Sequence, residues 1–140
     1  MDLDVDGTPL VWSATSPGSG RVMPAPRGST LAELSERVAV LRSIGEGYVE
    51  AGFPDRDYPY LAFGFRARYA IVEIFPSAER TLLLVGNGVV ANDINAEVPI
   101  LDELATFTGD FVTDVDRAWT LVRSFLLDGS AVHLGTWQEL

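Results

Sequence analysis

The feature that most restricts the fold is a series of short strand-like runs joined by very short connections between residues 58 and 94. Apolar residues alternate with smaller or polar ones over 61–65, and a β-branched and aromatic run follows over 69–75. A third run covers 81–85, and the Asn-Gly pair after it predicts a tight hairpin whose return strand covers 89–94. Because parallel strands need crossovers of about a dozen residues or more, these connections predict an antiparallel meander.

Two segments outside this region have the apolar spacing of amphipathic helices. The first begins with a capping box at Thr30 and Glu33 and ends at Gly45. Its apolar stripe consists of Leu31, Leu34, Val38, Leu41 and Ile44. The second is expected to have Thr113 as its cap, with Asp116 at the third position, and to end at an Asp-Gly pair. Its apolar face consists of Val115, Ala118, Trp119, Val122, Phe125 and Leu126.

Together these elements predict an α+β fold in which an antiparallel β-meander sheet is packed on one face by two amphipathic helices. A length of 140 residues, 47% of them apolar, suits a single domain. We place that α+β domain at residues 29–140 and expect a last short strand at 131–137. Residues 1–28 are rich in Gly, Pro and Ser and are expected to be a loosely ordered segment, in which 10–12 could form an edge strand.

Charge is the most informative part of the composition. Twenty acidic residues stand against ten basic ones, all of them arginine, which gives a net charge of −10. This balance disfavours direct binding to nucleic acid or to an anionic membrane. The acidic residues are unevenly placed, because 81–116 contains seven of them and no basic residue. Such a surface serves either solubility or attraction to a basic partner, and composition leaves both open.

The residue types give little support to catalysis or to a cofactor. No cysteine is present and His133 is the only histidine, which excludes thiolate chemistry and metal sites with two histidines. His133 lies in the predicted last strand, where a structural role is expected. No nucleophile elbow is present, and the glycine pairs complete no dinucleotide fingerprint. We therefore expect no enzyme activity, cofactor or metal, although the pairs Asp55 with Asp57 and Asp102 with Glu103 leave a glycosidase-like arrangement open.

The expected location follows from two further features. No apolar run approaches the roughly 20 residues that a membrane-spanning helix needs. The chain also starts with an acidic stretch where a secretory signal would be basic. We therefore expect a cytoplasmic protein that does not associate with membranes.

A family resemblance appears near the end of the chain. The string Asp-Val-Asp-Arg-Ala-Trp at 114–119 is followed by Val-Arg-Ser-Phe-Leu-Leu-Asp-Gly at 122–129 and by Gly-Thr-Trp at 135–137. This unit resembles the late helix and the Trp-ending strand of immunity protein family one of bacterial polymorphic toxin systems. Residues 60–65 and 70–77 are similar to the central hairpin of that family.

Membership would imply a non-enzymatic cytoplasmic antidote that binds and neutralises one cognate toxin domain. Toxins of this kind include DNA cytidine deaminases and nucleases, whose phosphate-binding clefts are basic and would attract an acidic protein. Charge clustering then selects the expected interface: Asp93, Glu97, Asp102, Glu103 and Asp110, with Asp55 and Asp57 as a second patch.

Two other functions stay open on the sequence alone. The chain could be an adaptor that binds a partner other than a toxin, or a small-ligand-binding or enzymatic α+β domain. A deep pocket with converging buried carboxylates would favour the ligand-binding alternative.

Overall fold

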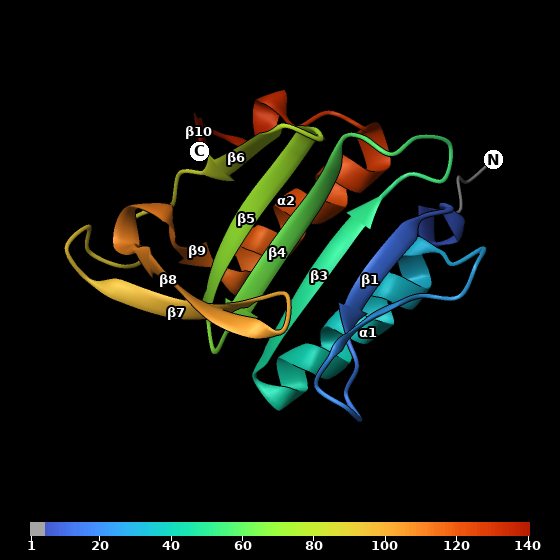
Figure 1. Cartoon of the computed structure of the whole chain (residues 1–140), viewed down its shortest axis with the longest axis horizontal. Helices are drawn as coiled ribbons and strands as arrows, with labels where there is room; N and C mark the ends of the chain where they lie inside the picture. Colours follow the sequence, from blue (N-terminus) through green and yellow to red (C-terminus); the bar gives the residue numbers. More distant parts are fainter. Residues whose placement is uncertain (1–4) are drawn as a thin grey trace.

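The computed structural model describes residues 5–140, and Figure 1 shows a large sheet with a small hairpin in front of it and two helices behind it. The large sheet has eight strands in the order β10-β6-β5-β4-β3-β1-β2, and β9 also pairs with β5. Every pair in it is antiparallel. This arrangement confirms the predicted α+β fold with two helices on one face of an antiparallel sheet.

The elements have the following bounds. The strands of the large sheet are β1 (Val11–Thr15), β2 (Val22–Pro24), β3 (Glu46–Gly52), β4 (Tyr60–Arg66), β5 (Tyr69–Ser77), β6 (Arg80–Leu84), β9 (Thr113–Asp114) and β10 (Trp137–Glu139). The small sheet is the hairpin of β7 (Asn95–Ile100) and β8 (Glu103–Thr108). The helices are α1 (Leu31–Ile44) and α2 (Val115–Asp128), and short 3₁₀ turns cover Val5–Gly7, Gly109–Phe111 and Val132–Leu134.

Helix α1 forms over the predicted residues, but the last residue of its predicted apolar stripe is exposed. Thr30 Oγ1 accepts a hydrogen bond from the Glu33 N–H, and the N–H of Gly45 donates to the Leu41 carbonyl with the glycine in the left-handed region at φ 109°. The other predicted stripe residues are buried, but Ile44 is 56% exposed. Ile44 is the last residue of the helix and lines a surface hollow in place of the core.

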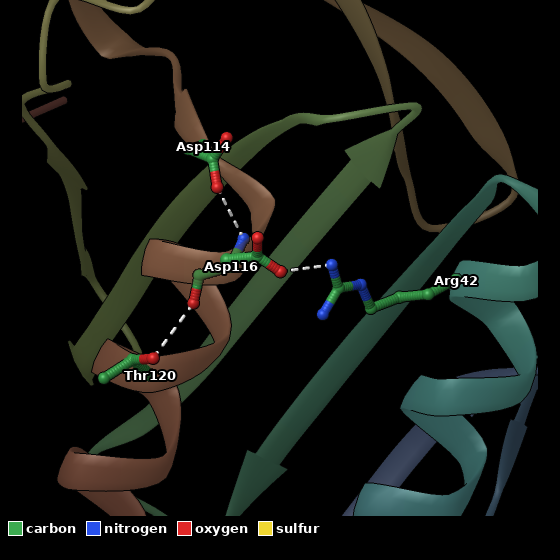
Figure 2. Close-up of polar contacts among 4 residues, drawn as sticks. All are labelled: Arg42, Asp114, Asp116 and Thr120. Atoms are coloured by element: carbon green, nitrogen blue, oxygen red, sulfur yellow. Dashed lines mark hydrogen bonds and ion pairs between the residues drawn. The ribbon is translucent and has the colours of Figure 1, made fainter.

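Helix α2 is capped one residue later than predicted. Asp114, and not Thr113, accepts the capping hydrogen bond from the Asp116 N–H at 2.9 Å (Figure 2). Thr113 pairs with Ala70 as part of β9, and this pairing holds its side chain in the interior, away from the helix end. The Asp116 carboxylate forms an ion pair with Arg42, which joins the end of α1 to the start of α2 (Figure 2).

The apolar interior has two parts, one on each face of the large sheet. The larger part lies between the sheet and both helices, and it includes Phe63 and Phe65 of β4 with Phe125 of α2. The smaller part lies on the opposite face, where Val98 of the hairpin packs with Ile71 of β5. The second face is therefore partly covered by β7 and β8, a feature that the sequence did not predict.

The strand of the N-terminal segment lies inside the large sheet, whereas an edge strand was expected. Residues 11–15 form a strand, but β1 lies between β3 and β2, so β2 is the edge strand. Trp12 is buried, and its indole N–H donates to the buried Ser29 Oγ at 2.7 Å. This contact, together with the pairing to β3, holds the segment onto the domain. Residues 1–4, which include most of the acidic start of the chain, lie outside the described residues.

The prediction of a tight hairpin after β6 is wrong. Residues 85–94 contain no strand, because the sheet edge that a return strand would need is taken by β10, which pairs with β6 from Leu82 to Leu84. Gly86 instead approaches the segment before α2, and its N–H donates to the Asp110 carbonyl at 2.7 Å. The chain therefore leaves the sheet and forms the separate β7–β8 hairpin.

The last strand is shorter and later than predicted. Residues 132–134 form a 3₁₀ turn, which places His133 outside any strand, and β10 begins only at Trp137. The Trp137 indole N–H donates to the Ala131 carbonyl at 2.9 Å. Trp137 is half-buried against the larger core, so it fastens the chain end to the sheet.

Candidate functional site

Five of the seven carboxylates expected at the interface lie on or beside the β7–β8 hairpin. Glu97 is on β7, Asp102 and Glu103 are at its turn, and Asp93 and Asp110 are in the flanking segments at its other end. All except the half-buried Asp110 are exposed. The remaining two acidic residues of 81–116, those that cap and brace α2, belong to the helix junction (Figure 2). We call the five residues the acidic hairpin surface.

Two of these carboxylates also have structural partners. Asp102 Oδ1 accepts a hydrogen bond from the Val22 N–H at 2.7 Å, which ties the turn of the hairpin to β2. Asp110 accepts a hydrogen bond from the Thr108 hydroxyl. In the described part of the chain, the side chains of Glu97 and Glu103 form no hydrogen bond or ion pair, so their charges are available to a partner.

The second predicted patch does not join this surface. Asp55 and Asp57 are exposed in the loop between β3 and β4. Figure 1 shows that loop at the opposite end of the strands from the turn of the hairpin. Arg56 lies between the two residues, and its Nε is 3.9 Å from Asp55 Oδ1. The loop is therefore a separate and partly compensated group of charges.

Apolar side chains accompany the acidic residues at the turn of the hairpin. Leu101 and Leu104 are each about half exposed, and with Ile44 they line a hollow of about 280 Å³ beside Asp102 and Glu103. Exposed apolar groups next to charges are typical of surfaces that bind other proteins, since the apolar part anchors and the charges orient.

A second feature lies on the same face of the large sheet, and the sequence did not predict it. Beside the hairpin is a hollow of about 470 Å³ whose walls include Tyr48, Glu50, Tyr60, Glu73 and Phe75. Glu50 on β3 and Glu73 on β5 both pair with Ala62 on β4, so their side chains stand on the same face on either side of a small residue. We call this feature the carboxylate hollow.

Burial perturbs the titratable groups of the carboxylate hollow. Glu73 is only 8% exposed, and its loss of hydration, with a smaller contribution from the charge of Glu50, raises its pKa. Burial likewise raises the pKa of Tyr48, whose hydroxyl donates to Glu50 Oε2 at 2.7 Å. The pKa of Tyr60 is also raised, by burial first and then by Glu50. Ionised Glu73 is thus held in an environment that disfavours its charge.

One sequence signal could have identified Glu73. It is the only charged residue in the apolar run 70–75, at a position where a buried side chain is expected. Glu50 has no such signal, because it lies in a stretch of mixed polarity. The pairing of β3, β4 and β5 brings the two carboxylates to one place.

Substitution of Glu73 by Gln should stabilise the protein at neutral pH. Because the pKa of Glu73 is raised in the folded state, the protein loses stability as pH rises from the ordinary glutamate pKa through the folded-state pKa. Above the folded-state pKa, the native state has the full energetic cost of the buried charge. We expect Glu73→Gln to increase the free energy of unfolding by about 1 kcal/mol at neutral pH. Urea unfolding should show that this gain in the free energy of unfolding vanishes below pH 4.5, the ordinary pKa of a glutamate, because Glu73 is then neutral in both states. Glu97→Gln, at an exposed site, is the control and should change stability little at either pH.

The single histidine does not form a catalytic triad. His133 Nε2 lies 3.4 Å from Ser124 Oγ and 3.3 Å from Asp128 Oδ2. A triad requires the nucleophile and the acid on different ring nitrogens, whereas both groups here approach the same one. Among residues 5–140, no group of three or more His, Asp or Glu side chains converges as metal ligands would.

Comparison with known proteins identifies no relative. No protein-family model, curated protein or solved structure matches the chain. Within the described residues, no helix has the length and apolar character needed to cross a membrane.

Proposed function

We propose that the chain is a non-catalytic inhibitor that binds a basic partner protein through the acidic hairpin surface. Following the resemblance to immunity proteins, the partner we propose is a cognate toxin domain that acts on nucleic acid, and the complex forms in the cytoplasm. One observation carries the proposal: the long stretch without a basic residue forms an exposed hairpin rich in carboxylates.

The physical chemistry of association supports this assignment. A protein that acts on nucleic acid needs a cleft lined by Lys and Arg to hold phosphates. Exposed carboxylates on a rigid element accelerate encounter with such a cleft and compete with the phosphates for it. The half-exposed Leu101 and Leu104 supply apolar area that slows dissociation once the hairpin is seated.

Co-expression tests the function directly. The C-terminal domain encoded by the neighbouring gene is expressed alone and together with this chain, and growth and co-purification are measured. We expect growth arrest by the domain alone, rescue by this chain and a stable one-to-one complex. A toxic neighbour that this chain neither rescues nor binds would contradict the antidote function and favour an adaptor with another partner.

Charge reversal on the hairpin should slow association with the partner. We expect Glu97→Arg combined with Glu103→Arg to lower the association rate by about tenfold or more at low salt, because two steering charges change sign. The variant spares Asp102, whose hydrogen bond to Val22 is structural. Stopped-flow or surface-binding kinetics over a range of salt concentrations measure the effect.

The matched control for this prediction is Asp55→Arg combined with Asp57→Arg. It changes the net charge equally but at the opposite end of the strands (Figure 1). An equal loss of rate in both variants would show that net charge matters and the hairpin surface does not, which overturns the proposed interface.

A further inference from the structure

The carboxylate hollow contains a buried charge that lacks a partner. Glu73 is more than nine-tenths buried and faces the hollow, yet its carboxylate forms no hydrogen bond or ion pair with any of residues 5–140. None of the described residues that line the hollow is basic. Burial of this carboxylate without a partner disfavours its charged form, and a cationic group placed in the hollow would compensate that charge.

A second carboxylate is held in place beside it. Glu50 Oε2 accepts the 2.7 Å hydrogen bond from Tyr48, whose ring is almost fully buried, so the Glu50 side chain is oriented before any ligand arrives. Its other oxygen has no partner among the described residues. Because both glutamates pair with Ala62, their backbones are two strand spacings, or about 10 Å, apart. Side chains from both strands can therefore contact one group placed above Ala62.

An aromatic wall completes the hollow. The rings of Tyr60 and Phe75 stack with centroids 4.5 Å apart and planes 13° from parallel, and both line the hollow. The electron-rich faces of such rings attract organic cations, and the attraction is strongest where water is excluded.

The carboxylates and aromatic rings of the hollow indicate which class of ligand it would bind. A hard metal ion would need a larger set of converging oxygen ligands than the part of the chain described here brings together. A guanidinium group matches better, because it is planar, stacks on aromatic rings and donates several hydrogen bonds to carboxylates.

We propose that the carboxylate hollow is a binding site for a guanidinium group, held between Glu50 and Glu73 and stacked on the wall formed by Tyr60. The group belongs either to a small molecule or to an arginine side chain of a partner protein. The site is distinct from the acidic hairpin surface, although Ile100 and Leu101 at the end of β7 form part of its rim.

Titration of the free protein with small guanidinium compounds tests the proposal. The probes are butylguanidine, which represents a small molecule, and N-acetyl-arginine amide, which represents a protein side chain, and each carries a single positive charge. The matched neutral probe is N-acetyl-citrulline amide, which has the same shape and no charge. We expect saturable NMR shifts of the Tyr60 ring and the Ala62 methyl group with the two cations and none with the citrulline compound. Tighter binding of butylguanidine favours a small molecule as the source of the guanidinium group, and tighter binding of the arginine amide favours a protein side chain.

Variants distinguish the site from general attraction to an acidic protein. Glu73→Gln should weaken binding by about tenfold or more, because one charged hydrogen-bond acceptor is lost. Since this variant is expected to be at least as stable as the parent chain, unfolding would not explain the loss. Glu36→Gln removes the same charge at an exposed position of α1, outside the hollow, and should leave the affinity unchanged. Equal binding of the citrulline probe, no saturable shift, or an unchanged affinity in Glu73→Gln would overturn the proposal. Because no toxin is present, failure here is independent of the antidote function.

Discussion

Replacement of Gly64 by Ala is expected to detach the hairpin from the large sheet and to cost about 3 kcal/mol of stability. A Cβ at Gly64 would lie 1.9 Å from the carbonyl oxygen of Pro99 on β7, a distance that no real contact reaches. The obstacle is backbone, so no side-chain rotation relieves it. The hairpin must shift, and its contact between Val98 and the sheet must loosen.

Two measurements check this result. Urea unfolding gives the loss of stability, and amide hydrogen exchange should show faster exchange in β7 and β8 than in the centre of the large sheet. Gly18→Ala is the control, because a Cβ there would meet nothing closer than 4.0 Å. A Gly64→Ala protein within about 0.5 kcal/mol of the parent chain would show that the hairpin does not depend on this close approach.

Replacement of Phe125 by Ala is expected to cost about 3 to 5 kcal/mol, a large share of the about 5 to 15 kcal/mol that stabilises a typical domain. Phe125 is fully buried between α2 and the sheet. Its ring lies 5.4 Å from that of Phe53, which in turn carries the Arg56 guanidinium 4.4 Å above its face. The cavity would therefore weaken both the helix docking and the β3–β4 loop.

The control lies two residues further along the same helix. Leu127 is 43% exposed, so Leu127→Ala removes apolar volume without opening an interior cavity. We expect it to change the free energy of unfolding by less than about 0.5 kcal/mol. Similar losses in the two variants would contradict an interior cavity as the cause of the Phe125→Ala effect, and helical propensity would not explain them because alanine is the better helix former.

The elements that the sequence predicts well are those whose signals are local. Helix α1 has its cap, stripe and terminal glycine within a few turns, and β4 and β5 have alternating or β-branched runs joined by a short turn. The hairpin of β7 and β8 lacks such a signal, because Pro99 interrupts its first strand and each of its two strands contains a glutamate. Its position depends on the absence of a side chain at Gly64, which is distant in the sequence.

Like the fold, the candidate site could be predicted only in those parts whose signals are local in the sequence. Charge clustering located the residues of the acidic hairpin surface, since the stretch without basic residues is visible without any structure. The same reasoning gave Asp55 and Asp57 as a second patch, and only the fold shows how far that patch lies from the hairpin. The carboxylate hollow required the register of three strands, because Glu50 and Glu73 meet only through their common neighbour Ala62.

The short outer strands of the large sheet have a consequence for behaviour in concentrated solution. Long, unpaired sheet edges invite other chains to add strands, which leads to aggregation and domain swapping. Here both outer strands, β2 and β10, have only three residues. Pro24 in β2 has no N–H to offer, and Arg80 with Glu139 places an ion pair on the opposite edge. The large sheet is thereby protected against growth, so we expect partners to recognise side chains on its faces and not backbone groups at its rim.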